Sequence, residues 1–447
     1  MYRKILNGCL AVTFLFSTLV AQTSAASAMS LIRDAETEHV LRTFAEPVFK
    51  AAGLQPKAVR IHIINDNRIN AFVAGGQRMF IHTGLIYRSD TPSMLIGVMA
   101  HETGHIAGGH LSRIQNEAKG ATAPMIISLL LGVGAIIAGA GDVGAAVIAG
   151  GQTVAQRSIL QYSRVQEAAA DQAAITYLDK LGWSGKGMLR TFEIFRDQEL
   201  LSGRYQDPYL RSHPLSSDRL AALENRVAKS PYSDRKDPEG WIIALDMVKA
   251  KLHGFIDRPE ATYRRFPQSD QSAPARYART VAYHKEGRLK EALLEVDSLI
   301  KELPGSPFLR ELKGQVLFES GKAKLAIKPY REAVALAPTS GLLHLALGQA
   351  MIEVGDDALL DAAVVHLNYA RRYETDYPLI YHQIALAQAR LGNEGLASLA
   401  TAERFYLSGA LPDARIHAKR AQKYLSEGSP TWLRAEDILQ TRRRKKG

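Results

Sequence analysis

The chain has 447 residues, too many for one ordinary hydrophobic core, and about two or three domains are expected. Its content of 46% hydrophobic and 23% charged residues is typical of a globular protein and excludes an intrinsically disordered one. The net charge of +11 comes partly from the basic run 442–446, which we interpret as a solvated tail. No aromatic residues interleave with this run and no nucleic-acid motif accompanies it, so we assign no nucleic-acid binding.

The first 28 residues have the pattern of a cleaved secretory signal peptide. Arg3 and Lys4 precede an apolar run from Cys9 to Ala21, and small residues follow at 23–28. A membrane span needs about 20 apolar residues, and this run is shorter. Cys9 is the only cysteine, so the mature chain would have none, and a metal site would have to use histidine and carboxylate ligands. We therefore expect export to an oxidising compartment such as the bacterial periplasm.

The mature chain begins with a helical pattern that changes to a strand pattern. Apolar residues recur at helical spacing from Leu31 to Ala52, and we expect one helix there. Alternation at 59–63 and 71–73 predicts strands, Gly75-Gly76 predicts a turn, and 79–81 is the expected hairpin partner. A free edge of this sheet could hold an extended peptide through its backbone. An ordinary hairpin packed on a helix is the alternative.

An H-E-x-x-H pattern occupies residues 101–105, inside a helix that we predict from about Pro92 to Ile114. His101 and His105 are four residues apart, so they lie on one face and can bind one metal ion. Glu102 then lies beside the open coordination position, where it can take a proton from metal-activated water. This arrangement is typical of zinc peptidases. A helix with half-buried structural histidines is the alternative.

A third metal ligand is expected on another helix. His110 follows His101 by nine positions, half a turn around a helix, so we expect it to face elsewhere and exclude it. Glu167 and Asp171 are four apart, so the first could bind the metal while the second accepts the outer N–H of His101. Alanines at 168–170 would let another helix approach closely. An acidic pair on a solvated helix face is the alternative.

Four motifs in this order resemble a family of zinc metallopeptidases. They are Asn70-Ala71-Phe72, the H-E-x-x-H pattern, the segment Arg164 to Asp171, and Ser212-His213-Pro214-Leu215 continuing to Arg219. The family includes HtpX, the CAAX prenyl protease and the BepA-like periplasmic proteins. The resemblance implies one Zn²⁺ ion per chain.

The resemblance also implies roles for two further places in the sequence. Asn70, Ala71 and Phe72 would line the substrate cleft. A histidine in the place of His213 can approach the zinc as an extra ligand, which would hold the enzyme latent; otherwise His213 could stabilise the oxyanion during attack. A capping or surface histidine before a proline is the alternative for His213.

The segment 121–151 between the two metal-binding helices is apolar and rich in glycine. A single membrane crossing would separate the two helices, which must share one side to bind one ion. We therefore expect an apolar helical hairpin or lid that covers the cleft and could contact a membrane surface or an unfolded outer-membrane protein. Plain burial in the core is the alternative.

The C-terminal half repeats itself. Charged, proline-containing sequence at 230–239 marks a domain junction, and beyond it Gly287, Gly321 and Gly355 are spaced by 34 residues. This period resembles tetratricopeptide repeats, with about four helix pairs and weaker pairs at either end. Such pairs stack into a solenoid whose concave surface suits a peptide or helix. We expect partner or substrate docking there, and a structural cap on the first domain is the alternative.

These observations predict a mainly α protein with a small β-sheet. The expected parts are a signal peptide at 1–28, a gluzincin-type metallopeptidase domain at 29–235 and a tetratricopeptide-repeat solenoid at 240–447. The resemblance implies a periplasmic zinc endopeptidase that acts on misfolded or misassembled outer-membrane proteins. It further implies a chaperone-like role, contact with the outer-membrane assembly machinery and peripheral membrane contact. A repeat-based chaperone or adaptor with a latent or structural zinc site is the alternative.

Overall fold

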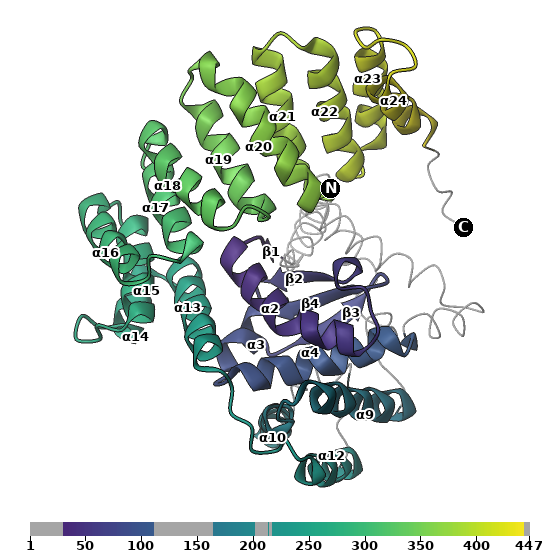
Figure 1. The fold of residues 1–447 in the computed structure, drawn as a ribbon, viewed down its shortest axis with the longest axis vertical. Helices are drawn as coiled ribbons and strands as arrows, with labels where there is room; N and C mark the ends of the chain where they lie inside the picture. The colour runs from purple at the N-terminus through teal and green to yellow at the C-terminus, as the bar shows by residue number, and fades with distance from the viewer. Residues whose placement is uncertain (1–29, 111–163, 202–212, 214–216, 442–447) are drawn as a thin grey trace, which may run out of the picture.

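The computed structural model describes residues 30–110, 164–201, 213 and 217–441 (Figure 1). This part of the chain is mainly helical and contains one four-stranded sheet, which confirms the predicted fold class. The predicted signal peptide, the apolar segment 121–151 and the basic tail lie outside the described residues. None of the described helices is both long enough and apolar enough to cross a membrane.

The sheet has the strand order β1-β2-β4-β3, so β1 and β3 are its edges. Its strands are β1 (Leu31–Ile32), β2 (Arg60–Ile64), β3 (Ala71–Ala74) and β4 (Arg78–His82). The predicted hairpin is confirmed: β3 and β4 pair antiparallel with Phe72 opposite Phe80, whereas β2 and β4 are parallel. Gly75 and Gly76 form the turn with φ values of 58° and 93°, a conformation that glycine adopts without steric cost.

The first predicted helix begins later than expected. Helix α2 spans Ala35–Ala51, and Leu31–Ile32 instead pairs antiparallel with β2. The side chain of Asp34 accepts a hydrogen bond from the Thr37 backbone N–H at 2.7 Å, which caps the helix at this point. The expectation of a continuous helix from Leu31 was therefore wrong, because the apolar residues before the cap are used by the sheet.

Helices pack around the sheet and complete the first part of the molecule. They are η1 (Pro56–Ala58), α3 (Thr83–Arg88), α4 (Pro92–Ala107), α9 (Arg164–Leu181), α10 (Lys186–Leu201) and α12 (Ser217–Lys229). One hydrophobic core joins buried side chains of α2, the strands, α4, α9, α10 and α12. The helix that carries the H-E-x-x-H pattern is thus held on several sides by apolar packing.

The C-terminal half is a solenoid of antiparallel helix pairs. Its helices are α13 (Glu239–Ile256), α14 (Pro259–Arg265), α15 (Ala273–Lys285), α16 (Leu289–Glu302), α17 (Pro307–Glu319), α18 (Ala323–Leu336), α19 (Gly341–Glu353), η3 (Asp357–Leu359), α20 (Leu360–Tyr373), α21 (Pro378–Arg390), α22 (Glu394–Leu407), α23 (Leu411–Gln422) and α24 (Pro430–Gln440). The glycines spaced by 34 residues have φ values of 72° to 82° at the turns within pairs. The periodic sequence therefore folds as repeated helical hairpins.

The two halves share a helix and a tightly packed interface. Leu245, Val248 and Leu252 of α13 belong to the core of the first half, whereas Met247 of the same helix belongs to a core of the repeats. The repeat helices curve around the end of the first half that carries β1 and α2 (Figure 1). Arg33 there forms an ion pair with Glu374, which follows α20.

Candidate metal centre

Helix α4 presents the three polar residues of the H-E-x-x-H pattern in a buried setting. His101, Glu102 and His105 all have relative exposures of 0%. Gly104 lets α9 approach, since a Cβ atom at this position would lie 2.9 Å from the Ala170 carbonyl oxygen. The small residues of both helices therefore bring the two motifs together, as the alanines at 168–170 predicted.

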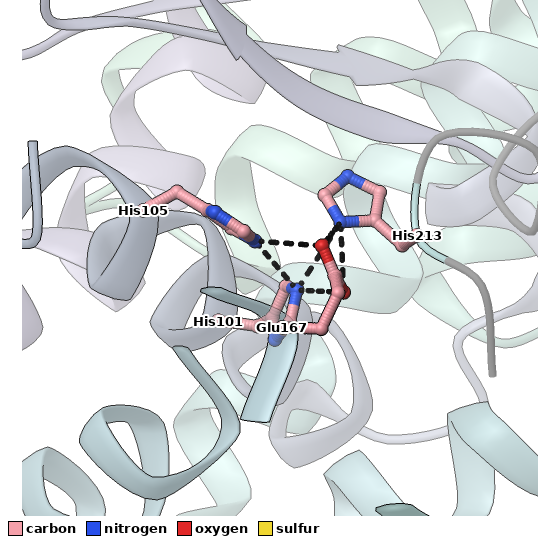
Figure 2. Close-up of side chains that lie close together, drawn as sticks. All are labelled: His101, His105, Glu167 and His213. Atoms are coloured by element: carbon pink, nitrogen blue, oxygen red, sulfur yellow. Dashed lines mark hydrogen bonds and ion pairs between the residues drawn. The ribbon is translucent and has the colours of Figure 1, made fainter. Parts of the chain in front are cut away.

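Four side chains converge in this place (Figure 2): His101, His105, Glu167 and His213. His101 Nε2 lies 3.0 Å from His105 Nε2 and 3.5 Å from Glu167 Oε2, and His105 Nε2 lies 3.4 Å from Glu167 Oε1. His213 Nδ1 lies 3.3 Å from His101 Nε2 and 3.1 Å from Glu167 Oε1. Tetrahedral ligands at zinc distances are separated by about 3.3 Å. The four donors, which all lie within 4.8 Å of one another, are therefore close enough to bind one zinc ion.

The chemistry of the donors also fits zinc. Imidazole nitrogen and carboxylate oxygen are both ordinary Zn²⁺ ligands, and all four side chains are buried. His213 is therefore a candidate fourth donor beside His101, His105 and Glu167. The residues present therefore fit one zinc ion.

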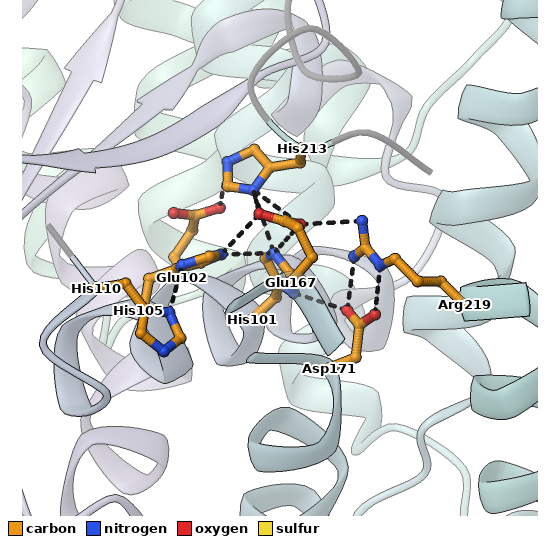
Figure 3. Close-up of polar contacts among 8 residues, drawn as sticks. All are labelled: His101, Glu102, His105, His110, Glu167, Asp171, His213 and Arg219. Carbon is orange, nitrogen blue, oxygen red and sulfur yellow. Dashed lines mark hydrogen bonds and ion pairs between the residues drawn. The ribbon is translucent and has the colours of Figure 1, made fainter. Parts of the chain in front are cut away.

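A second layer of contacts holds these ligands (Figure 3). Asp171 Oδ1 lies 2.9 Å from His101 Nδ1, on the side of the ring away from the other donors. Arg219 of α12 donates to both carboxylate oxygens of Asp171, at 2.8 and 2.9 Å, and its Nη1 lies 3.0 Å from Glu167 Oε2. One guanidinium group therefore joins Glu167 and Asp171, two acidic residues of α9.

Burial and neighbouring charges shift the titration of the cluster. Burial opposes ionisation of Glu167, but His213 and His101 prevail and lower its pKa. Burial likewise opposes protonation of His101, yet its contacts with Asp171 and Glu167 raise its pKa to about 10. Both effects favour opposite charges on neighbouring side chains, and binding of Zn²⁺ would require the His101 imidazole to lose its proton.

Glu102 has a different environment from Glu167. Its carboxylate is fully buried, and its Oε1 lies 3.5 Å from His213 Nε2. Burial raises the pKa of Glu102, against the opposing effect of His213 and His101. A carboxylate with a raised pKa is suited to accept and return a proton near neutral pH.

The helix carrying the motif ends earlier than predicted, at Ala107 and not near Ile114. Gly108 and Gly109 follow, and Gly109 has a φ of 62°, a conformation typical of helix ends. His110 consequently does not face away from the site: its Nδ1 lies 2.9 Å from His105 Nδ1. The predicted orientation of His110 was wrong, although it is not among the four converging donors.

The predicted substrate-binding residues lie at the edge of the sheet. Ala71 and Phe72 belong to edge strand β3, and Asn70 directly precedes it. Phe72 stacks on Phe80 with ring centroids 4.9 Å apart. The structure thus identifies β3 as one of the two sheet edges, a point that the sequence left open.

Arg219 is a residue of the metal centre for which the sequence indicated no role, although it ends the fourth motif of the family resemblance. On α12 the buried positions are Arg219, Leu220, Leu223 and Val227. The signal that could have identified it is its spacing, because Arg219 lies four and eight residues before the apolar positions 223 and 227 and so shares their buried helix face. A buried guanidinium needs an acidic partner.

The sheet, the helices and the closed His/Glu cluster define a metallopeptidase joined to a helical solenoid. Residues 34–227 match the family described as Peptidase family M48, and the buried His/Glu cluster in this part of the chain fits the zinc ion of a metalloprotease. The protein is therefore a metalloprotease.

Relatives extend the similarity beyond this domain. The chain is 26% identical to the Beta-barrel assembly-enhancing protease of Escherichia coli strain K12, over 82% of the chain and 75% of that protein. It is 24% identical to the protein of the same name from Yersinia pestis, over 86% of the chain and 79% of that protein. Metalloprotease LoiP of E. coli is 26% identical over 44% of the chain and 74% of its own length.

Proposed function

We propose that this protein is a periplasmic zinc endopeptidase that hydrolyses peptide bonds in misfolded or stalled outer-membrane proteins. The observation that carries the proposal is the set of four buried donors within 4.8 Å of one another, beside the buried carboxylate of Glu102. The names of the beta-barrel assembly-enhancing relatives support the substrate class, and the predicted signal peptide supports the compartment.

The proposed roles follow from the positions of the side chains. His101, His105 and Glu167 would hold the zinc, which when bound lowers the pKa of coordinated water and polarises a peptide carbonyl. Glu102 would accept the proton released during attack and return it to the leaving amine. Asp171 would accept a hydrogen bond from the Nδ1–H of His101, which fixes the ring in the tautomer that presents Nε2 to the metal.

His213 would control access to the site. With its Nδ1 as a fourth ligand, His213 would occupy the position that attacking water or a substrate carbonyl needs, so this imidazole would have to leave before cleavage. His213→Ala should then raise casein cleavage by the purified protein without loss of bound zinc. Lower cleavage would instead favour a role in stabilising the oxyanion, and unchanged zinc coordination and cleavage would exclude both roles.

An extended substrate segment would pair with strand β3. The His82 backbone N–H donates to the Asn70 carbonyl at 3.0 Å. Along an antiparallel strand, residues whose backbone groups bond to the neighbouring strand alternate with residues whose backbone groups point the other way. The backbone groups of Ala71 and Val73 therefore point away from β4, toward the outer side of the edge strand. Pairing there would bind the substrate through its backbone and leave sequence preference loose.

The proposed domains are a peptidase domain at 29–235 and a repeat domain at 240–447. The repeat helices α15 and α17 contact the start of α2, where the Tyr277 hydroxyl donates to Glu36 at 2.5 Å and Phe308 packs against His39. These contacts support a structural role for this face of the solenoid. Docking of outer-membrane proteins or assembly partners, with a chaperone-like role, would use repeat surfaces that are not packed on the peptidase.

A second function is favoured by the closed ligand set itself. Four protein ligands are typical of structural zinc sites, so an assembly chaperone or adaptor with a latent zinc centre also fits. Zinc content and casein cleavage, with and without chelator, distinguish the two. About one zinc per chain, lost in the His101→Ala, His105→Ala double variant, together with chelator-sensitive cleavage supports the peptidase. Zinc without cleavage, including in His213→Ala, supports the adaptor.

A further inference from the structure

His105 has two ring nitrogens with different partners. Its Nε2 faces the other metal donors, 3.0 Å from His101 Nε2 and 3.4 Å from Glu167 Oε1. Its Nδ1 lies on the opposite side of the ring, 2.9 Å from Nδ1 of His110. The two rings are nearly perpendicular, at 79°, and both are buried (Figure 3). A hydrogen bond between the two Nδ1 atoms is therefore well defined.

The direction of this hydrogen bond follows from metal binding. An imidazole that ligates through Nε2 carries its proton on Nδ1, so His105 must donate and His110 Nδ1 must accept. We propose that His110 is a positioning residue for the metal centre, which fixes the tautomer and ring orientation of His105. It would serve His105 as Asp171 serves His101. This inference rests on the proposed metal-binding role of His105.

The Nδ1 atoms of His101 and His105 face hydrogen-bond acceptors of different charge. Asp171 is a carboxylate that also pairs with Arg219, whereas His110 accepts with an uncharged nitrogen. The centre already buries the carboxyl groups of Glu102, Glu167 and Asp171. A neutral acceptor orients His105 without adding another buried negative charge, which would be costly to desolvate.

The two glycines after α4 bring His110 to this place. A Cβ atom on Gly108 would lie 2.5 Å from His110 Nε2, and Gly109 has a φ of 62°. Larger residues at either position would displace the ring or strain the backbone. Gly108→Ala is therefore an independent way to disturb His110 without changing its side chain.

The test measures Zn²⁺ affinity of the mature full-length protein with a competing chelator, and the visible spectrum of the Co²⁺-substituted protein. His110→Leu should weaken Zn²⁺ binding about 10- to 100-fold and alter the Co²⁺ spectrum. His110→Asn places an amide oxygen near the Nδ1 position and should retain affinity within a few-fold. Gly108→Ala should resemble His110→Leu.

A matched control comes from the repeats. His344 and His366 form another histidine pair with Nδ1 atoms 2.9 Å apart, and His344 is also buried. His344→Leu removes a similar contact and should leave Zn²⁺ affinity and the Co²⁺ spectrum unchanged.

The proposal would be overturned if His110→Leu kept the wild-type Zn²⁺ affinity and Co²⁺ spectrum. It would also be overturned if His110→Asn lost as much Zn²⁺ affinity as His110→Leu. If His110→Leu does not fold, the other two variants decide. Retained Zn²⁺ affinity in His110→Asn together with weaker Zn²⁺ binding in Gly108→Ala supports the proposal, and any other combination overturns it. Because the readout is metal binding, failure here is distinct from an absence of proteolysis.

Discussion

Among the described residues, two buried clusters of charged groups differ in the source of the cation that balances their carboxylates. In the metal centre, nitrogen and oxygen donors from α4, α9 and His213 converge on one point. In the interface cluster, defined by Asp34, Glu36, Lys251, Tyr277 and Glu311, the Lys251 ammonium occupies the centre. Its Nζ lies 2.5 Å from Asp34 Oδ2, 3.1 Å from Glu311 Oε2 and 3.6 Å from Glu36 Oε2.

The difference shows two ways to compensate buried carboxylates. The interface cluster contains its own cation, and its formation joins α2 to α13 and α17 across the two halves of the molecule. The metal centre instead holds its donors in fixed orientations through outer contacts such as Asp171, Arg219 and His110. A site prepared for an external ion needs such support, because its ligands must be correctly placed when the ion binds.

The largest expected effect is a loss of proteolytic activity in the metal centre without a loss of stability. Glu102→Gln keeps the size of the side chain but removes the base, so casein cleavage should fall about 10²- to 10⁴-fold. Zinc content and thermal stability should stay at the wild-type values, because Glu102 is not one of the converging donors. Retained cleavage would contradict the assignment of the base.

Removing the cation of the interface cluster should mainly affect stability. Lys251→Met leaves its acidic partners buried without their ammonium group, which should cost about 3–5 kcal/mol in urea unfolding. Lys313→Met is the control, since this more exposed lysine pairs with Asp297 at 2.5 Å and its loss should cost less than about 1 kcal/mol. Similar losses of unfolding free energy in both variants would show that Lys251 stabilises the fold no more than an exposed lysine does.

Arg219 tests how strongly outer contacts support the metal donors. Arg219→Lys keeps a positive charge but cannot reproduce the paired hydrogen bonds to Asp171 together with the contact to Glu167. Zinc affinity, measured by chelator competition, should fall about 10- to 100-fold. Arg226→Lys on the same helix is the control, because its guanidinium contacts only the exposed hydroxyl of Thr176 among the described polar contacts. Equal effects would refute a specific role for Arg219.

The smallest expected effect is a pH dependence of the interface cluster. Burial raises the pKa of Glu36 to about 7, although Lys251 opposes the shift. A carboxyl group with a raised folded-state pKa stabilises the fold fully below its unfolded pKa and loses this contribution as the pH rises through about 7. Unfolding free energy should fall by about 1 kcal/mol between pH 6 and 8 from this group. Glu36→Gln should remove that part of the slope, and an unchanged slope would contradict the assignment.

Most residues of the metal centre could be predicted from the sequence, because they lie in short motifs with helical spacing. His101 and His105 share a face wherever residues 101–105 are helical, and Glu167 and Asp171 do so on α9. The structure brings these residues and His213 together as the motifs had indicated. His110 was misplaced because counting along one helix ignored Gly108 and Gly109, which end it.

The interface cluster could not be predicted in the same way. Its charged members are dispersed from Asp34 to Glu311, and each one alone has the appearance of an ordinary surface residue. Only the docking of the repeats on the peptidase places Lys251 among three carboxylates and buries it.

The sequence by itself determined the helical repeats, the β-hairpin and the zinc-peptidase motifs, because local spacing decides which side chains share a face. The tertiary structure alone decided that β3 is an edge strand, that His213 Nδ1 lies 3.3 Å from His101 Nε2, and that His110 contacts His105. These features depend on how separate segments pack and on where a helix ends. Periodicity within a segment carries no information about either.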